Sequence, residues 1–343
     1  MTSVLVTGIG GSIGIDVARS LRRDASVRII GGDGNEWGRR IAAGLCDEVV
    51  ALPRADHDAS GFVSEIERVI AERSIDFVFI NPDPELEGVA ATSYRPSTSH
   101  ALPPPPVIEV CLDKSKTVSA AKGSSAFPRT IPIADDQDVV KGFEQLGSPL
   151  WLRARVGPGG RGSISVASAD EALSWIRYWQ SRGRADRWMM QEYLPGRNFN
   201  WTGVYADGKL MISVAMERLR YFLAEPAVSG ISGQVAFCAT VQPERFLQMA
   251  TDVVLMVDPN PSGFYSVDIR EDAAGEPKVT EINPRLAGRP WLYTNAGVNL
   301  PLFVVRRALR MEPGDAVSPK GLAVGLHEYR QLDVEPVFGV PSQ

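Results

Sequence analysis

Cysteine and histidine are scarce in this sequence of 343 residues, which contains three of each. Cys46, Cys111 and Cys238 lie far apart and are odd in number, and no CxxC pair occurs. The sequence therefore supports neither a disulfide framework nor a thiolate zinc site, and it fits a reducing compartment. The histidines are equally isolated, which argues against a histidine metal site.

Long apolar runs and basic tracts are missing as well. No stretch approaches the ~18 apolar residues that span a membrane. The first residues, MTSVLVTGIGGSIG, lack the basic segment and cleavage site of a signal peptide. The net charge is -5 and the arginines are scattered, so nucleic acid is not an expected partner. With 44% hydrophobic and 22% charged residues, the composition is that of a globular protein. We expect a cytoplasmic enzyme without a membrane partner.

The N-terminal part alternates short β-rich runs with helical patterns. The strand-like runs include Ser3–Thr7, Val27–Ile30 and Ile75–Ile80, and helical spacing follows at Ile15–Arg23 and Phe62–Arg73. This alternation predicts a parallel, doubly wound α/β sheet. Proline and serine then crowd the segment 97–106, which indicates a linker or exposed loop.

From Trp151 onward the pattern changes to strands separated by turn signals, which predicts an α+β region. Asp207-Gly208 between two apolar runs predicts a hairpin. Ser168 has the character of an N-cap for an amphipathic helix over Ala169–Arg182. Two strands, Tyr265–Ile269 and Val279–Ile282, flank a turn and are expected to pair.

A glycine-rich turn, Gly8–Gly14, connects the first strand to the first helix. Such a turn directs backbone N–H groups at an anion and resembles a dinucleotide fingerprint with its last glycine one position late. Asp33 follows about 20 residues on, where a ribose-binding acid is expected. An NAD(P)-dependent oxidoreductase is therefore one alternative. Its usual Tyr-x-x-x-Lys pair is matched only by Tyr205 and Lys209, across an Asp-Gly turn that disfavours a helix.

A more specific pattern is VTEINPR at 279–285. In a strand, Glu281 and Asn283 point to the same face, and Asp268 lies on the preceding strand of the expected hairpin. Hard oxygen donors in an incomplete protein shell suit Mg²⁺ that bridges phosphates. Arg285, two residues further on, is placed to stabilise charge on a transferring phosphoryl group.

Three further motifs precede this one in the chain. Lys114 begins a helical stretch and is able to reach a nucleotide phosphate. In PLWLRARVGPGGRGSISV a strand ends near Arg153, and the glycine-rich segment 157–162 is expected to fold over phosphates and supply N–H donors. The segment MQEYLPG at 190–196 is typical of a strand leading into a hinge whose backbone pairs with adenine.

The order of these motifs resembles the ATP-grasp superfamily, in particular the branch with the synthetase domains of carbamoyl phosphate synthase and related carboxylate–amine ligases. The resemblance covers nearly the whole chain. It implies a Rossmann-like pre-ATP-grasp domain at 1–111, which in this family usually binds no dinucleotide. An ATP-grasp fold of two α+β lobes is then expected at 112–195 and 196–343, the second with a C-terminal tail. INPDPEL at 80–86 resembles the family's loop after the last strand of the first domain.

The resemblance implies ATP and Mg²⁺, with Mn²⁺ as a possible substitute, as cofactors. The implied nucleotide contacts are Lys114, Arg153, Gly159, Gly160, Arg161, Gly162, Gln191, Glu192, Tyr193, Leu194 and Asn198. The implied metal ligands are Asp268, Glu281 and Asn283. The residues expected to act on the reacting groups are Arg285, Arg153, Arg218 and Arg289.

Some positions depart from the family pattern or are less specific. Ala154 stands where a proline is common, and Asn198 stands where a glutamate often contacts the ribose; its amide can still accept a hydrogen bond from a hydroxyl. In the expected substrate-covering segment 217–234, Arg218 and Arg220 form a candidate carboxylate clamp, with two solvated arginines as the equally weighted alternative.

The function implied is an ADP-forming ligase that activates a small carboxylate as an acyl phosphate and passes it to an amine or related nucleophile. A second alternative, suggested by Ala154 and Asn198, is a non-catalytic ATP-binding protein. With one grasp unit, the chain is not a complete carbamoyl phosphate synthase. A homodimer is expected by resemblance only, and the two substrates are not specified by the sequence.

Overall fold

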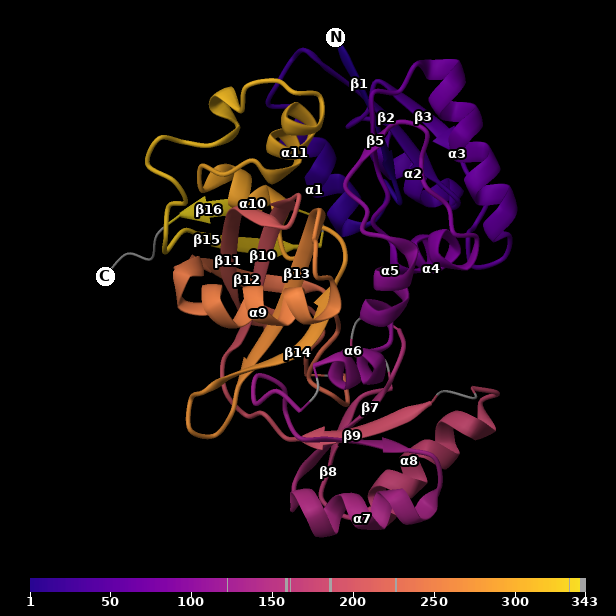
Figure 1. The fold of residues 1–343 in the computed structure, drawn as a ribbon, viewed down its shortest axis with the longest axis vertical. Helices are drawn as coiled ribbons and strands as arrows, with labels where there is room; N and C mark the ends of the chain where they lie inside the picture. The colour runs from indigo at the N-terminus through magenta and orange to yellow at the C-terminus, as the bar shows by residue number, and fades with distance from the viewer. Residues whose placement is uncertain are drawn as a thin grey trace.

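The computed structural model describes residues 1–121, 123–157, 160, 162–184, 187–225, 227–332 and 334–339. Three sheets follow one another along the long axis of the molecule (Figure 1). An N-terminal sheet lies at one end, a seven-stranded sheet lies in the middle, and a small four-stranded sheet lies at the other end. Among the described residues, no helix has the length and apolar character needed to cross a membrane.

The N-terminal sheet is parallel, in the order β3-β2-β1-β4-β5. Its strands are β1 (Thr2–Thr7), β2 (Val27–Asp33), β3 (Glu48–Ala51), β4 (Phe77–Phe79) and β5 (Ser99–His100). The accompanying helices are α1 (Ser12–Leu21), α2 (Glu36–Ala42), α3 (Ala59–Arg73), α4 (Asp83–Ala91) and α5 (Pro105–Leu112). Along β1, Val4 and Val6 pack into one core and Leu5 packs into another, because alternate side chains face opposite sides of a strand. The doubly wound sheet predicted from the sequence is confirmed.

The predicted linker at 97–106 was only partly correct. This segment carries β5 and the beginning of α5, and Leu102 is buried in the core between the sheet and its helices. Prolines at the first positions of α5 are compatible with a helix, because the first turn needs no backbone N–H donors.

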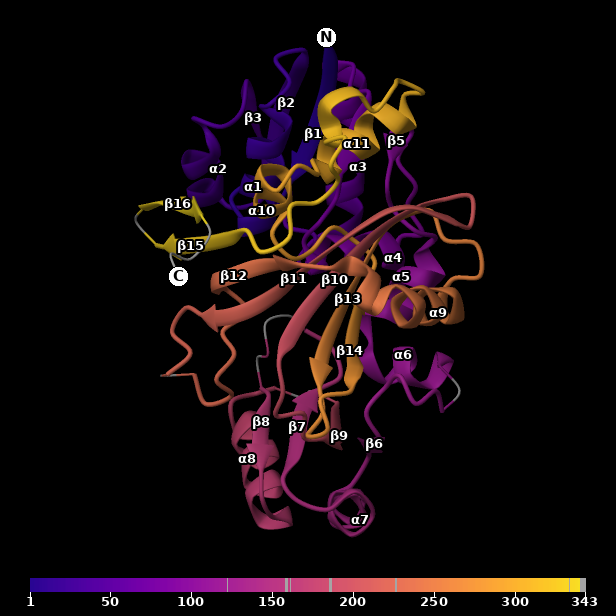
Figure 2. The ribbon, with the colours of Figure 1, turned by 90° about the vertical axis from the view of Figure 1, so that its left-hand side faces the viewer.

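The small sheet has the order β6-β9-β7-β8. Its strands are β6 (Thr130–Ile133), β7 (Leu150–Ala154), β8 (Ile164–Val166) and β9 (Trp188–Glu192), and its helices are α7 (Asp136–Leu146) and α8 (Ala169–Ser181). As predicted, Ser168 caps α8, with its side chain accepting a hydrogen bond from the Glu171 N–H at 3.3 Å. Figure 2 shows this unit projecting from the rest of the molecule. The short helix α6 (Lys114–Ala120) precedes it.

The middle sheet is antiparallel, in the order β14-β13-β10-β11-β12-β15-β16. Its strands are β10 (Asn198–Ala206), β11 (Lys209–Tyr221), β12 (Val235–Val241), β13 (Gly263–Glu271), β14 (Pro277–Asn283), β15 (His327–Gln331) and β16 (Val334–Gly339). The 3₁₀ turn η1 (Pro243–Phe246) and helix α9 (Leu247–Val257) join β12 to β13. Asp207 and Gly208 form the predicted β10–β11 turn, with φ of 50° and 77°.

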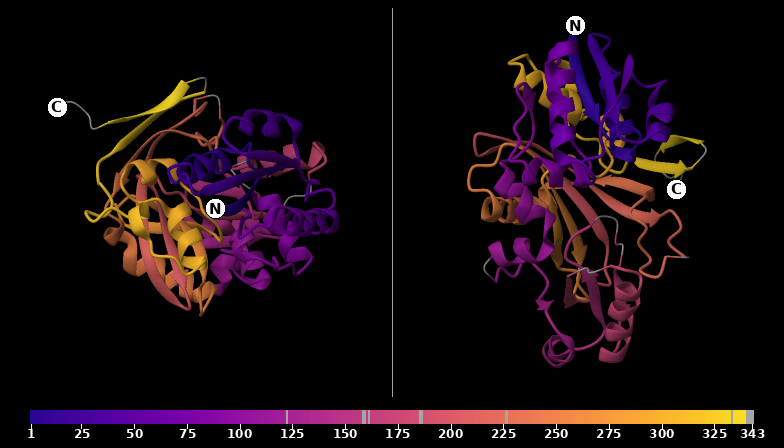
Figure 3. Two further views of the ribbon diagram at one scale, coloured as in Figure 1. Left: turned by 90° about the horizontal axis from the view of Figure 1, so that it is seen from above. Right: turned by 90° about the vertical axis from the view of Figure 1, so that its right-hand side faces the viewer.

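The chain then returns to the N-terminal unit. After β14 it forms α10 (Pro290–Asn295), α11 (Leu300–Ala308) and the 3₁₀ turn η2 (Gly314–Ala316). Figure 3 shows this C-terminal part lying beside the N-terminal unit, and α10 and α11 both pack against α1. Asn299 donates a hydrogen bond to the Ser20 carbonyl at 2.7 Å, and Arg306 contacts Asp24 at 2.6 Å. These contacts fasten the C-terminal helices to the N-terminal unit.

Candidate active site

A cavity of about 550 Å³ lies where the three units meet. The N-terminal unit contributes Asp83, the small sheet contributes Arg153 and Gln191, and the middle sheet contributes Asp268 and Glu281. Pockets of this size between domains commonly hold small-molecule ligands. The cavity therefore gathers residues from most of the motifs that the sequence singled out, although Lys114 is not among the residues that line it.

The floor of the cavity is built by the neighbouring strands β11, β10, β13 and β14. Side chains at alternate positions of a strand share a face, so cross-strand partners form rows of polar groups. We call these the arginine row, the carboxylate row and the hydroxyl row. Their members are Arg218, Asn198 and Arg270; Asn200, Asp268 and Glu281; and Thr202, Ser266 and Asn283.

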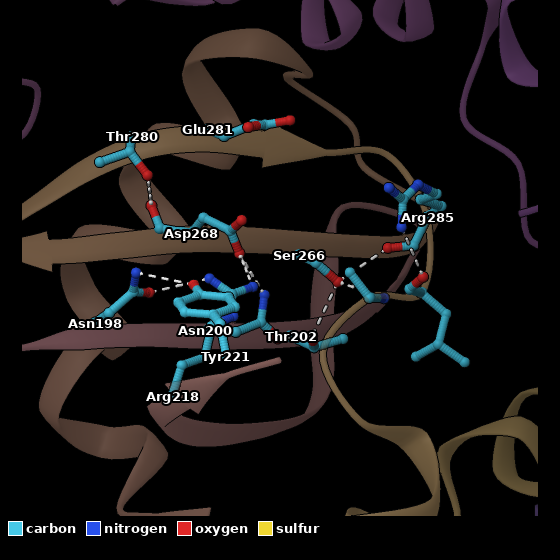
Figure 4. A network of polar contacts seen from close by, with 12 residues as sticks. Asn198, Asn200, Thr202, Arg218, Tyr221, Ser266, Asp268, Thr280, Glu281 and Arg285 are labelled. Atoms are coloured by element: carbon cyan, nitrogen blue, oxygen red, sulfur yellow. Dashed lines mark hydrogen bonds and ion pairs between the residues drawn. The ribbon is translucent and has the colours of Figure 1, made fainter. Parts of the chain in front are cut away.

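Asp268 has one carboxylate oxygen fixed by neighbouring side chains (Figure 4). Its Oδ1 accepts hydrogen bonds from Arg218 at 2.7 Å and from Asn200 at 2.8 Å. Thr280 Oγ1 donates to the Asp268 backbone carbonyl at 3.2 Å. These bonds orient the carboxylate and leave Oδ2 without a hydrogen-bonding partner among the described residues.

Glu281 faces two buried cations. Its Oε1 lies 3.5 Å from Lys114 Nζ, and its Oε2 lies 3.2 Å from Arg153 Nη2. Burial lowers the pKa of Lys114 and that of Arg153, and Glu281 partly offsets both shifts. The two cations that the sequence assigned to phosphate binding therefore meet the carboxylate that it assigned to metal binding. Arg153 Nε is buried without a hydrogen-bond partner, so donor capacity remains.

The donor set fits a divalent cation of the hard type. Asn283 is 6% exposed and lines the cavity, and no hydrogen bond of its amide group is found among the described residues. In those residues no group of three His, Cys, Asp or Glu side chains gathers at one point. Two carboxylates and one amide oxygen would leave about half of an octahedral shell to water and phosphate oxygens, which is how Mg²⁺ is commonly bound.

Arg285 connects the metal strand to the N-terminal unit. Its Nε donates to Asp83 Oδ1 at 2.6 Å, and both residues line the cavity. The sequence motifs assign no role to Asp83, although it lies in the INPDPEL segment that resembles the family's loop. The ion pair fixes the guanidinium at the end of β14, beside the hydroxyl row.

Arg289 is buried and fully engaged by two carboxylates. Its Nε and Nη2 bind Glu328 at 2.8 and 2.9 Å, and its Nη1 lies 3.0 Å from Asp16. Burial raises the pKa of Asp16 to about 6, although Arg289 opposes the shift. We call Asp16, Arg289 and Glu328 the buried triad. Sequence reasoning missed both acids because no motif surrounds them.

The candidate clamp of Arg218 and Arg220 is not formed. Arg218 is held by Asp268 and by the Asn198 amide oxygen at 3.1 Å, whereas the Arg220 side chain is 71% exposed and lies 3.9 Å from Glu225. An irregularity in β11 between the two arginines breaks the alternation that would have placed both on one face. The solvated alternative therefore holds for Arg220.

The hinge residues Gln191 to Leu194 line the cavity at the end opposite the N-terminal unit. Gln191 donates to Thr130 Oγ1 at 2.9 Å, and Glu192 accepts from the Arg129 N–H at 2.8 Å. Arg129 engages both the Glu192 side chain and the Glu192 backbone N–H, which donates to the Arg129 carbonyl at 3.1 Å. Asn198 also lines the cavity, but its amide is bound to Arg218 and to Tyr221.

Two residues of the predicted phosphate lid are described, and two are not. Gly160 lines the cavity with φ of 67°, and Gly162, with φ of 78°, accepts a hydrogen bond from the Trp175 indole at 2.8 Å. Gly159 and Arg161 lie outside the described residues. The end of the glycine-rich segment is thus fastened to α8.

The N-terminal glycine turn does not offer a dinucleotide site. Asp33, the expected ribose acid, accepts hydrogen bonds from the N–H groups of Gly10 at 2.9 Å and Asn35 at 2.8 Å. Gly10 packs directly on Gly38, so its backbone is covered. Tyr205 and Lys209 lie on paired strands rather than one helix. These contacts weigh against the oxidoreductase alternative.

No protein-family model matches the sequence. Solved structures resemble the chain along nearly its whole length at low identity. N5-carboxyaminoimidazole synthetase from Staphylococcus aureus is 14% identical over 96% of this chain and 82% of that chain, with a TM-score of 0.65. L-amino acid ligase from Bacillus licheniformis is 14% identical over 96% and 79%, with a TM-score of 0.68. Biotin carboxylase from Campylobacter jejuni, in a complex with β,γ-ATP, is 14% identical over 95% and 74%, with a TM-score of 0.68. The chain has the ATP-grasp fold expected from its sequence.

Proposed function

We propose that the protein is an ADP-forming ligase that activates a small carboxylic acid with ATP and joins it to an amine or a related nucleophile. The observation that carries this proposal is the pairing of Asp268 with Glu281 on the cavity floor, opposite Lys114 and Arg153. Candidate metal ligands and candidate phosphate-binding cations, which come from three separate motifs, thus lie close together. The structures with this fold include ligases and a biotin carboxylase bound to a nucleotide.

In the proposed reaction, a substrate carboxylate oxygen attacks the γ-phosphoryl group of ATP and ADP leaves. An amine then attacks the carbonyl carbon of the acyl phosphate, and phosphate leaves. The protein supplies no nucleophile, so catalysis rests on positioning and electrostatics. Mg²⁺ held by Asp268, Glu281 and Asn283 would neutralise charge that develops on the phosphoryl oxygens.

The cationic side chains around the cavity have separate roles in the proposed reaction. Lys114 and Arg153 bind the phosphates, and they exchange part of their contact with Glu281 for contact with the nucleotide. Arg285, fixed by Asp83, stabilises negative charge near the end of β14. The glycine-rich segment at 157–162 excludes water, which would otherwise hydrolyse the acyl phosphate.

The test is an assay of ADP release from Mg-ATP with small acids and amines in pairs, with hydroxylamine as a trap for the acyl phosphate. Glu281→Gln should reduce ADP release at least about 100-fold, as removal of one charge-stabilising group commonly does. Glu276→Gln is the matched control, because Glu276 is an exposed residue of the same hairpin. Calorimetry should also show that Mg²⁺ no longer strengthens ATP binding to Glu281→Gln.

The non-catalytic alternative makes a different prediction. If the wild-type protein binds ATP but forms neither ADP nor hydroxamate with any pair, that alternative gains support. If Glu281→Gln keeps full ADP-forming activity, the metal assignment is wrong. If the wild-type protein binds no ATP, the proposed function is refuted.

A further inference from the structure

Arg270 differs from four other arginines that line the cavity, and Arg330, which also lines it, donates a hydrogen bond to the Val235 carbonyl at 2.6 Å. Arg153, Arg218, Arg285 and Arg289 each lie within 3.2 Å of a carboxylate. For Arg270, no carboxylate within salt-bridge distance is found among the described residues, and its Nε is buried without a hydrogen-bond partner. A partly buried guanidinium is rarely left without an anion, because burial of an unpaired charge is costly. An anionic ligand would supply the missing partner.

The carboxylates closest to Arg270 are bound to other arginines and do not act as its anionic partner. Glu217, on the neighbouring part of β11, is bound by Arg197, with its Oε1 at 2.7 Å from Arg197 Nε. Asp268 is bound by Arg218 at 2.7 Å, and Glu271 is bound by Arg245. The acids around Arg270 are thus already neutralised by other arginines.

Arg270 has a defined place between the hinge and the carboxylate row. It is two residues beyond Asp268 on β13, and the next residue, Glu271, pairs with the hinge backbone. Gly196 N–H donates to the Glu271 carbonyl at 3.0 Å, and Glu271 N–H donates to the Arg197 carbonyl at 3.0 Å. Arg270 also lines both the main cavity and a second, more open one of about 610 Å³ behind the hinge.

A nucleotide bound as proposed must cross this row. With its base at Gln191 to Leu194 and its terminal phosphates at the carboxylate row, its ribose and α-phosphate pass over the arginine row. The other two members of that row are occupied, because Asn198 is bound to Arg218 and Tyr221, and Arg218 is bound to Asp268. Of the two guanidinium groups in the described part of this row, that of Arg270 is the one without a carboxylate partner.

We propose that Arg270 binds the α-phosphate of ATP. This inference rests on the proposed function and names a nucleotide contact that the sequence motifs did not indicate. A phosphate group matches the planar donor fork of a guanidinium, whereas the ribose offers only neutral hydroxyl groups. The contact would be made equally by ATP, ADP and AMP, because all three carry the α-phosphate.

The experiment is calorimetry of ATP, ADP, AMP and adenosine binding to the protein and its variants, without acid or amine substrates. Arg270→Gln should weaken all three nucleotides about 10- to 100-fold, the usual effect of losing a charged hydrogen bond, and should leave adenosine binding unchanged. Lys114→Gln should weaken ATP and ADP but not AMP, because Lys114 lies at the carboxylate row. Arg220→Gln is the matched control, since Arg220 lines neither cavity and its side chain is 71% exposed.

Thermal unfolding separates binding from structure. Because no carboxylate of the described residues pairs with Arg270, Arg270→Gln should unfold at the same temperature as the wild type or at a higher one. A lower unfolding temperature, an equal loss of adenosine binding, or a loss confined to ATP would each overturn the assignment. Unchanged binding of all three nucleotides would do the same. If the wild type binds none of the four ligands, the proposed function itself fails.

Discussion

The buried triad allows a quantitative test of what joins the N-terminal unit to the middle sheet. Arg289, Asp16 and Glu328 have side chains that are 3%, 2% and 0% exposed. Arg289→Met keeps most of the side-chain volume but removes the cation that Asp16 and Glu328 both contact, and leaves them the more distant charge of Arg330. Removal of one partner from a buried ion pair costs about 3–5 kcal/mol, so we expect a loss of that size in the free energy of unfolding at neutral pH.

The loss should depend on pH in a defined direction. Burial raises the pKa of Asp16 to about 6, above its ordinary value of 3.8. In the wild type, the contribution of Asp16 to the free energy of unfolding is therefore fully present below pH 3.8 and is lost as the pH rises to about 6. In Arg289→Met, without this cation, the buried carboxyl groups must stay protonated in the folded protein. Because protonation becomes less favourable as the pH rises, the free energy of unfolding should keep falling above pH 6. The difference between variant and wild type should be larger at pH 8 than at pH 5.5.

Urea unfolding at these two pH values, followed by circular dichroism, measures both effects. Arg177→Met is the matched control, because Arg177 and Asp136 form an exposed pair with 65% and 70% exposed side chains, worth about 0–1 kcal/mol. Adding Glu328→Gln to Arg289→Met should restore part of the stability, because one uncompensated acid is removed. The reasoning is refuted if Arg289→Met costs no more than the control, or if its cost is the same at both pH values.

Two further variants test other parts of the fold. Burial raises the pKa of Glu85 to about 8, so the free energy of unfolding of the wild type should fall as the pH rises from about 4.5 to about 8, by up to about 1.4 kcal/mol per pH unit. Glu85→Gln should make this fall smaller in urea titrations. An unchanged dependence on pH would show that Glu85 does not cause it. Trp175→Phe removes the indole N–H that holds the Gly162 carbonyl, so it should cost about 1 kcal/mol of unfolding free energy and raise the dissociation constant for ATP measured by calorimetry. Wild-type ATP affinity in Trp175→Phe would contradict a role for this bond in holding the lid.

The sequence predicted those parts of the site that depend on local pattern. Two β-rich runs separated by a turn indicated the β13–β14 hairpin, and the pairing of Asp268 with Glu281 follows from its register. The parallel order of the first sheet followed from the alternation of strands and helices in the same way. In these cases the interacting residues are close in sequence, or the period of the pattern fixes the face of each side chain.

The remaining parts depend on contacts between distant segments. Asp83 lies 202 positions before its partner Arg285, and no local pattern connects the two. For Arg220 the local pattern was misleading. Strict alternation along a strand predicts that Arg220 lies on the same face as Arg218, but an irregularity in β11 turns Arg220 outward. Arg270 was passed over because its position becomes informative only when the ion pairs of its neighbours are known.

The packing of α10 and α11 on α1 affects the order in which the chain can fold. Val17, Ala18 and Leu21 of α1 share one core with residues of α10 and α11 such as Leu292 and Phe303. During synthesis the first sheet leaves the ribosome long before the residues that cover this side of α1. The nascent chain must therefore leave the side of α1 that α10 and α11 later cover exposed during the synthesis of both later sheets, a period in which chaperone binding or aggregation competes with folding.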